Sequence, residues 1–316
     1  MSLKSFLKKN KTVIKAHSWL NQKKYEMATL ISPEVNTKIR YKAEFGKKLD
    51  LDNPITLNEK ILWLKLNRYM NHPLVIQCAD KYRVREYIQQ AGCEDILNDL
   101  IGAWDSADEI PWEDLPNQFV LKWNFGAGMN IICSDKSKLD KKTVIRQMRK
   151  WGRKKAWLSH SEMQYKYAPK KIVCEKFLTE DQTSSKIQIA DYKVYCFNGK
   201  PMFTMVCLDR DLGHPKFYFF DNDWNLARIN KDSKNAPEDF TMEKPKCLDK
   251  LLDCATKLSN PFPFVRADFY VLGSDVYFGE LTFTPSGGLD SNRLKETDIM
   301  MGSLVDIQYT QGDLLS

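Results

Sequence analysis

Short runs of β-branched and aromatic residues, separated by turn residues, fill most of the chain after residue 118, and they constrain the fold more than any other feature. Two pairs of runs are joined by tight turns, at Asn198-Gly199 and at residues 273–275, and strands joined so closely pair antiparallel. Two helix-like segments, 141–157 and 248–258, lie between the runs. The runs cover residues 119–122, 131–133, 172–174, 191–197, 201–208, 264–272 and 276–283. The pattern predicts an α+β fold with antiparallel sheets.

The first third of the chain has helical spacing instead. Thr56 and Glu59 have the spacing of a capping box, in which each side chain binds the backbone N–H of the other, and the predicted helix continues to Leu66. A second predicted helix covers Asp80 to Gln90. Residues 51–117 are therefore expected to be mostly helical.

The net charge of +7 comes from one end of the chain. Residues 1–50 carry twelve Lys and Arg against four acidic residues, whereas the remaining residues are close to neutral, with 36 basic and 37 acidic side chains. Apolar residues recur among these lysines at loosely helical spacing. Two interpretations stay open: a basic helical segment that packs one stripe on the body, or a surface that contacts an anionic membrane or a lipid-linked glycan.

Neither the first residues nor the cysteines indicate export. The chain does not start with an apolar run and a small-residue cleavage site, and no run reaches the roughly 20 apolar residues of a membrane span. The eight cysteines include no CxxC pair, which is typical of ordinary buried thiols in a reducing compartment. The sequence predicts a soluble cytoplasmic protein.

A glycine-containing loop lies between two predicted strands. Lys122 ends the first strand, and Gly126, Ala127 and Gly128 follow it. Glycine lets backbone N–H groups approach phosphate oxygens closely, and a nearby lysine adds positive charge. The spacing matches neither a P-loop nor a dinucleotide-binding fingerprint, so a plain glycine hairpin is the alternative.

Two acidic residues of the C-terminal hairpin form a candidate metal site. With Ser274 at the centre of the turn, Asp268 lies opposite Glu280. Alternation along the strands puts Arg266 and Thr282 on the same face. Facing carboxylates repel, and a divalent cation with oxygen ligands is the usual compensation. The alternative is a solvated acidic edge, which the flanking aromatic residues disfavour.

A third polar group follows an apolar strand. Glu175 closes the apolar run that starts at residue 172, and Asp191 lies beyond a polar loop. A strand end with exposed backbone and adjacent acids can hold the edge of an adenine and a ribose diol. A strand with a salt-bridged end is the alternative.

The order of these three groups along the chain resembles the ATP-grasp superfamily, and the details resemble its TupA-like branch, which is associated with teichuronopeptide and with capsular or other surface polysaccharide synthesis. The resemblance covers about residues 50–290. It is carried by NPITLNEKILWLKL (53–66), DKYRVREYI (80–88), FVLKWNFGAGMNIICSDKS (119–137), CEKFL (174–178), DYKVYCFNGKP (191–201) and FPFVRADFYVLGSDVYFGELTFTPSGG (262–288).

The resemblance implies an ATP-grasp fold, in which two α+β subdomains with antiparallel sheets clamp ATP. The expected domains are a basic helical segment 1–50, a mostly helical region 51–117 and an ATP-grasp body 118–316. The body would divide into a first nucleotide-binding subdomain, 118–180, and a second subdomain with the Mg²⁺ site, 181–316.

Roles carry over from the family residue by residue. The resemblance implies contacts to ATP phosphates from Arg85, Lys122, Lys193, Gly126, Ala127 and Gly128. Adenine would be bound by Glu175 and by the backbone of Phe177 and Leu178, and the ribose by Asp191. Mg²⁺ would be bound by Asp268, Glu280 and Thr282. The cations implied to act on the transferred phosphoryl group are Arg266, Lys122 and Arg210. Lys81 lies close enough to Arg85 in the sequence to compete for its role.

Two positions depart from the family pattern. Thr282 replaces the usual asparagine, which is a better metal ligand, and this argues against a tightly bound second metal ion. Phe125 stands where a polar residue such as histidine is expected in the TupA-like branch. A contact from the glycine loop to phosphate or acceptor is therefore expected to be missing.

The implied reaction is an ATP- and Mg²⁺-dependent ligation of a carboxylate to an amine through an acyl phosphate. Such phosphoryl transfer needs positioning and charge neutralisation rather than a protein nucleophile, and the sequence has neither HExxH nor GxSxG. The implied substrates are a hexuronic acid of a surface polysaccharide or its precursor and an amine or amino acid. The alternatives are an ATP-dependent kinase and a non-catalytic nucleotide-binding scaffold. Nucleic acid is not an expected partner, because only the basic N-terminus favours it.

Overall fold

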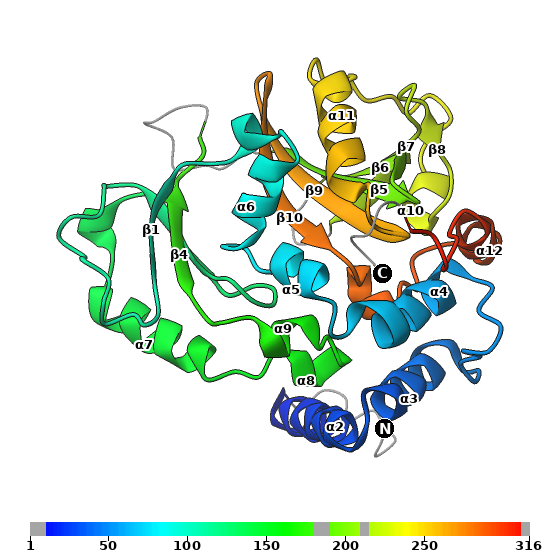
Figure 1. Ribbon diagram of the computed structural model, residues 1–316, viewed down its shortest axis with the longest axis horizontal. Helices are drawn as coiled ribbons and strands as arrows, with labels where there is room; N and C mark the ends of the chain where they lie inside the picture. The colour runs from blue at the N-terminus through cyan, green and yellow to red at the C-terminus, as the bar shows by residue number, and fades with distance from the viewer. Residues whose placement is uncertain (1–10, 180–189, 209–214, 311–316) are drawn as a thin grey trace.

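The computed structural model describes residues 11–179, 190–208 and 215–310. It confirms the α+β prediction with two antiparallel sheets, one of four strands in the order β1-β4-β2-β3 and one of six in the order β10-β9-β5-β6-β7-β8 (Figure 1). The smaller sheet and its helix α7 lie to one side of helices α5 and α6, and the larger sheet lies to the other (Figure 1).

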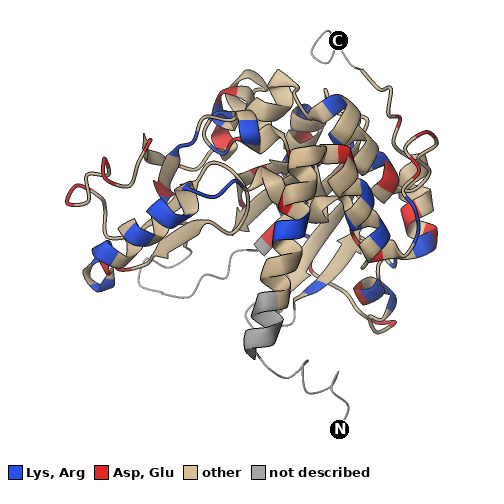
Figure 2. Ribbon diagram, turned by 90° about the horizontal axis from the view of Figure 1, so that it is seen from below, with Lys and Arg blue, Asp and Glu red and all other residues tan. Residues whose placement is uncertain are grey.

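Two helices at the surface precede the sheets (Figures 1 and 2). Helix α2 covers Lys11–Ile31, and α3 covers Pro33–Phe45. Ser32 caps the start of α3, and Gly46 ends it in the left-handed conformation, with φ of 71°. Both helices pack against α8 through a buried polar cluster described below, so the basic segment contacts the body. Among the described residues, no helix is both long and apolar enough to cross a membrane.

The predicted capping box begins helix α4, Leu57–Leu64, since Thr56 and Glu59 bind each other's backbone N–H. A π-helical turn, η1, continues it over Lys65–Tyr69, and α5 follows at Pro73–Ala79. Helix α6, Val84–Gln90, starts later than predicted. The reason is that the Asp80 carboxylate accepts the N–H groups of Tyr82 and Arg83 and holds a turn there.

The four-stranded sheet consists of β1 (Leu100–Trp104), β2 (Phe119–Trp123), β3 (Asn130–Cys133) and β4 (Ile172–Lys176). Strand β1 lies in the region expected to be mostly helical, and it pairs with β4. Between β3 and β4 lie α7 (Lys141–Gly152), α8 (Trp157–His160) and α9 (Gln164–Tyr167). Helix α7 packs on β2, where the Trp123 indole N–H donates to the Met148 carbonyl at 3.0 Å.

The six-stranded sheet consists of β5 (Ala190–Phe197), β6 (Lys200–Leu208), β7 (Lys216–Phe220), β8 (Leu226–Ala227), β9 (Phe264–Leu272) and β10 (Asp275–Thr282). Helix α11, Leu248–Ser259, packs on β5, β6 and β9, and the short helix α10, Lys231–Lys234, lies beside β7. The core between these elements is rich in aromatic side chains, and Phe264 and Phe269 are fully buried.

The predicted pairing of Asp268 with Glu280 is confirmed, but it arises from a different turn and register than the prediction assumed. The turn is not centred on Ser274, because Leu272 pairs directly with Asp275. That register alone would put Gly279 opposite Asp268. A β-bulge at Gly279 shifts the pairing by one residue, and a Cβ there would lie 2.9 Å from the Asp268 carbonyl oxygen. Glycine is therefore needed to bring the two carboxylates together.

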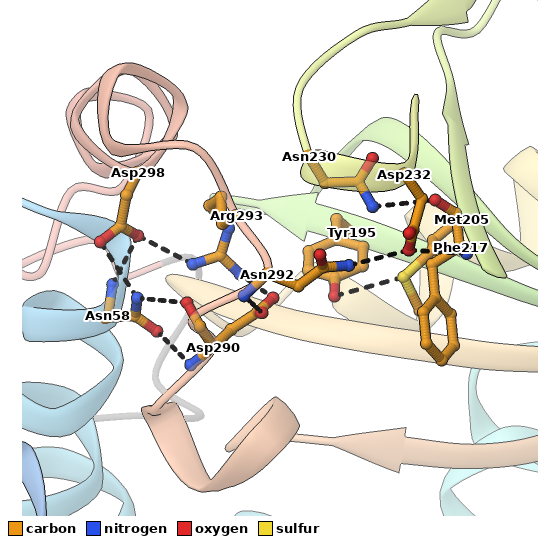
Figure 3. Close-up of polar contacts among 10 residues, drawn as sticks. All are labelled: Asn58, Tyr195, Met205, Phe217, Asn230, Asp232, Asp290, Asn292, Arg293 and Asp298. Carbon is orange, nitrogen blue, oxygen red and sulfur yellow. Dashed lines mark hydrogen bonds and ion pairs between the residues drawn. The ribbon is translucent and has the colours of Figure 1, made fainter. Parts of the chain in front are cut away.

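The segment after β10 ties the first helices to the larger sheet. A short turn, η5 (Pro285–Gly288), leads to α12 (Lys295–Ser303). The buried Arg293 guanidinium binds Asp298 at 2.8 Å and Asp290 at 3.1 Å (Figure 3). The Asn58 side chain of α4 in turn binds the Asp298 carboxylate and the Asp290 backbone. Asn292 continues the network to Asp232 near β7 (Figure 3). This polar network fixes α4 against the C-terminal part of the chain.

Candidate functional site

Six charged side chains meet on one face of β5, β9 and β10 and at the start of α6. The Arg266 guanidinium donates two hydrogen bonds of 2.6 Å to the two carboxylate oxygens of Asp268. Lys193, opposite Asp268 on β5, donates to Asp268 and to Asp191 at 2.8 Å each. Burial lowers the pKa of Lys193, but the two acids raise it more, so it stays charged. Lys193 thus keeps its positive charge despite its burial.

Glu280 lies across from Asp268 and has fewer contacts. Its Oε1 accepts from the Thr282 hydroxyl at 3.1 Å, and its Oε2 lies 3.3 Å from the Lys81 ammonium. Burial raises the pKa of Glu280, but Lys81, Arg266 and Lys193 lower it to about 2. The facing carboxylates are therefore already compensated by cations of the protein. The sequence analysis named a divalent cation as the usual compensation; in the structure, lysine and arginine side chains already provide it.

The donor set nevertheless fits Mg²⁺. Mg²⁺ prefers oxygen ligands and is typically held by one or two carboxylates together with substrate phosphates. Asp268, Glu280 and Thr282 offer that set, and no third acidic, His or Cys side chain joins them in a metal-binding group within the described ranges. The arrangement suits an ion that arrives with phosphates better than an ion held by protein alone.

A second charged cluster lies on the four-stranded sheet. The Lys122 ammonium of β2 lies 2.6 Å from a carboxylate oxygen of Glu175 on β4. Arg85 of α6 lies 3.8 Å from the other oxygen and also donates to the Asn98 carbonyl at 2.8 Å. Phe177, just beyond β4, is buried, and Leu178 is half-buried. The structure thus brings together residues that the sequence assigned to phosphates and adenine.

The glycine loop connects β2 and β3 and is anchored at its start. The buried Asn124 amide donates to Asp80 and to the Pro169 carbonyl at 2.7 Å each. Phe125 is also buried and packs against Trp123, with 5.5 Å between ring centroids. Phe125 therefore anchors the loop in the core of the smaller sheet, which explains why it is not polar. The tip of the loop, Ala127 and Gly128, is exposed.

Lys81 joins the carboxylate cluster to the glycine loop. Its ammonium donates to the Gly126 carbonyl at 2.9 Å and faces Glu280 at 3.3 Å, so one side chain contacts both the glycine loop and the carboxylate pair. The sequence argument had preferred Arg85, which contacts Glu175 instead. The sequence signal for Lys81 is its place directly after Asp80, whose carboxylate orients the turn that carries it.

A sequence profile of the TupA-like ATP-grasp family matches residues 59–306 of this chain. The chain belongs to the TupA-like ATP-grasp family. No curated protein sequence matches it. Among solved structures, the chain is similar to D-alanine–D-alanine ligase from Bacillus anthracis, with 16% identity and a TM-score of 0.39 over 72% of this chain and 64% of the ligase.

Two further solved structures show similar agreement. D-alanine–D-alanine ligase from Helicobacter pylori has 14% identity and a TM-score of 0.39 over 73% of this chain and 62% of the ligase. The ATP-grasp ligase PsnB, complexed with a minimal precursor, has 10% identity and a TM-score of 0.36 over 68% of this chain and 55% of PsnB. The chain therefore spans less than two thirds of each of these proteins.

Family membership establishes the ATP-grasp fold predicted from the sequence. In this TupA-like ATP-grasp chain, Asp191, Lys193, Arg266, Asp268, Glu280 and Thr282 share one cluster, and Arg85, Lys122 and Glu175 share the other. The remaining candidate, Arg210, lies outside the described residues.

Proposed function

We propose that this TupA-like protein is an ATP- and Mg²⁺-dependent carboxylate–amine ligase. The observation that carries the proposal is the pairing of Asp268 with Glu280 on adjacent strands, next to three cations, with Lys81 linking the pair to the glycine loop. Carboxylate oxygens that would bind a metal lie side by side with cations that would bind phosphate, which supports phosphoryl transfer at this place.

Each cluster would hold a different part of the nucleotide. Glu175 and the backbone of Phe177 and Leu178 would bind adenine, and Asp191 the ribose. Lys122, Arg85, Lys193 and the loop Gly126–Gly128 would bind phosphates, and Asp268, Glu280 and Thr282 would hold Mg²⁺. The bound nucleotide supplies the phosphoryl group that activates a substrate carboxylate as an acyl phosphate. Arg266 and Lys122 would offset the negative charge of that transfer, and Arg210 is a further cation proposed for this role.

The amide then forms when the amine, after giving up any ammonium proton to solvent, attacks the acyl carbon; phosphate leaves, and the proton lost from the nitrogen passes to the leaving phosphate or to solvent. We propose that the carboxylate belongs to a hexuronic acid of a surface polysaccharide or its precursor, and that the amine is an amino acid or a related amine. The resemblance to the branch associated with teichuronopeptide and capsular polysaccharide supports this substrate class.

Product analysis tests the proposal. Purified protein is incubated with Mg-ATP, with glucuronate or galacturonate, and with a panel of amino acids, and ADP, phosphate and products are measured by enzymatic assay and mass spectrometry. A ligase forms ADP, phosphate and an amide in equal amounts, and Glu280→Gln forms none of them. A stable phosphorylated product without free phosphate would identify a kinase instead. Nucleotide binding without turnover of any pair would identify a scaffold.

We also propose that the basic segment 1–50 contacts an anionic surface, a membrane or a lipid-linked glycan. Support comes from an apolar stripe on the outer side of α2, where five large side chains are 59% to 76% exposed and Lys23 and Lys24 lie among them. The five are Trp19, Leu20, Met27, Leu30 and Ile31. The opposite side of α2 is buried against the body through Ala28 and Thr29.

Vesicle sedimentation tests this contact. We expect the protein to pellet with vesicles that contain phosphatidylglycerol and not with neutral phosphatidylcholine vesicles. Leu20→Glu/Ile31→Glu should abolish pelleting, whereas Ile299→Glu/Met300→Glu, which changes exposed apolar residues of α12, should not. Pelleting that survives the α2 change would contradict the proposal. A wild-type dimer that the α2 change converts to monomer would assign the stripe to a second copy of the chain.

A further inference from the structure

A carboxylate outside both clusters lies beside the metal-binding strand. Glu162 connects α8 to α9, and its Oε1 accepts a hydrogen bond of 2.5 Å from the Thr284 hydroxyl. Thr284 lies two residues beyond Thr282 and four beyond Glu280 on the chain that leaves β10. Glu162 is therefore held by the same segment of chain that carries Glu280 and Thr282.

The turn that carries Glu162 is held in place from three directions. The preceding residue, Ser161, is in the left-handed conformation with φ of 57°, and its hydroxyl contacts Thr29 of α2 at 2.9 Å and Asn36 of α3 at 3.0 Å. From the other side, the buried Lys65 ammonium donates to the His160 carbonyl at 2.9 Å. All four of these side chains are buried. The backbone next to Glu162 is therefore fixed, as a binding residue requires.

Glu162 differs from the other acids of the site in having no ion pair. Asp191, Asp268, Glu175 and Glu280 each lie within 4 Å of a lysine or arginine nitrogen. Among the described residues, no Lys or Arg nitrogen comes that close to Glu162, although the side chain is only half-buried. A carboxylate that has one neutral donor and no ion pair can accept a charged donor from a ligand.

The electrostatic interactions of Glu162 extend to Glu280. Burial raises the pKa of Glu162, Glu280 raises it further, and the Thr284 hydrogen bond and Lys65 oppose the rise. Burial also raises the pKa of Tyr165, with additional contributions from Glu162 and Glu280. Glu162, Tyr165 and Glu280 therefore lie close enough to affect one another's charge, and Arg40 also lowers the pKa of Glu162.

We infer that Glu162 binds the ammonium group of the amine substrate, with Thr284 orienting its carboxylate. The inference rests on the proposed ligase function and specifies its second substrate as a primary amine that arrives protonated. Asp268 and Glu280 are less suited to this role, because cations of the protein already occupy their oxygens.

Two nucleophiles of similar size but different charge test the inference. Hydroxylamine is uncharged at neutral pH and traps acyl phosphates as hydroxamates, whereas methylamine is protonated. With Mg-ATP and glucuronate or galacturonate, Glu162→Gln should form hydroxamate at the wild-type rate. Its KM for methylamine should rise roughly 10- to 100-fold, as expected for the loss of a charge-assisted hydrogen bond of about 1.5–3 kcal/mol.

Matched variants separate binding from folding. Glu162→Asp keeps the charge and should stay within a few-fold of wild type, and Glu296→Gln of α12 should change nothing. If Glu162→Gln has a clearly lower melting temperature than wild type, the two nucleophiles are instead compared in Glu162→Asp and in Thr284→Val. Thr284→Val keeps the Glu162 charge but loses the hydroxyl that orients it, and it should raise only the KM for methylamine.

The possible outcomes are distinguishable. Equal loss of both products in Glu162→Gln, or a wild type that uses hydroxylamine but not methylamine, would overturn the inference and leave the ligase function standing. A wild type that forms no hydroxamate from either uronate would refute the proposed function, and the inference with it.

Discussion

Replacing Asp268 by asparagine should remove activity and also destabilise the fold. The asparagine side chain keeps the size of the aspartate but loses its negative charge. Asp268 is buried and accepts two hydrogen bonds from Arg266 and one from Lys193. The substitution therefore leaves two buried cations whose remaining acidic neighbours are Asp191, in contact with Lys193, and Glu280, on whose pKa both cations act.

The expected cost follows from these contacts. Removing one partner of a buried ion pair costs about 3–5 kcal/mol, because the other partner stays buried without compensation. The unfolding entropy of a chain of 316 residues is about 0.66 kcal/mol/K at about 2.1 cal/mol/K per residue. The melting temperature should fall by about 5–8 °C. Glu280→Gln should lower the free energy of unfolding by roughly 1 kcal/mol, because the Glu280 side chain is 36% exposed and the Lys81 ammonium lies 3.3 Å away.

Differential scanning calorimetry and ADP formation, measured on the same preparations, check both parts. Both variants should lose Mg²⁺-dependent turnover, and only Asp268→Asn should melt several degrees early. An Asp268→Asn variant that melts with wild type would show that Asp268 does not hold the two cations, and the argument that protein cations compensate the carboxylate pair would be wrong.

Three further predictions concern stability. Burial lowers the pKa of Lys65 to about 7, so between pH 7 and pH 10.5 the unfolded chain binds a proton that the folded chain does not. The free energy of unfolding, measured by urea titration, should therefore rise in that window by up to ~1.4 kcal/mol per pH unit. Lys65→Met should remove the rise. Burial raises the pKa of Glu59, but hydrogen bonds from Thr56, Tyr41 and Lys47 lower it to about 2. The contribution of the ionised Glu59 to the free energy of unfolding should therefore be lost as pH falls from 4.5 through 2. Glu59→Gln should remove this pH dependence in the same urea titration. Arg293→Met should lower the free energy of urea unfolding by about 3–5 kcal/mol. Arg149→Met, which breaks an exposed ion pair with Asp108, should lower it by at most about 1 kcal/mol. Equal losses of stability would contradict a special role for the network in Figure 3.

Local signals in the sequence predicted much of the fold. The capping box at Thr56 and the turn at Asn198-Gly199 depend on neighbouring residues only, and both form as predicted. Strand β1 was not predicted, because its five residues have no hairpin partner nearby and pair with β4 some 70 positions later. Helix α6 starts after the predicted Asp80, because a side-chain cap there competes with the helix.

The candidate site was predictable to the same degree. Alternation and hairpin pairing predicted Asp268 opposite Glu280 from a turn centred on Ser274, but the observed register depends on a β-bulge at Gly279 that was not foreseen. Lys81 and Glu162 depend on contacts between elements that are distant in the chain, such as Lys81 with Gly126 and Glu162 with Thr284. Periodicity within one element carries no information about such contacts.

The charges of the carboxylate cluster also bear on how its ligands bind. Asp191, Asp268 and Glu280 are balanced by Lys81, Lys193 and Arg266, so the cluster is formally neutral. A neutral, largely buried cluster attracts neither a free divalent cation nor a free polyphosphate strongly, because either would leave an uncompensated charge at low dielectric. A cation and a phosphate that arrive together avoid that cost. The longest ion pair in the cluster, between Lys81 and Glu280, is the one that such a pair would replace most easily, with the metal binding Glu280 and the phosphate binding Lys81.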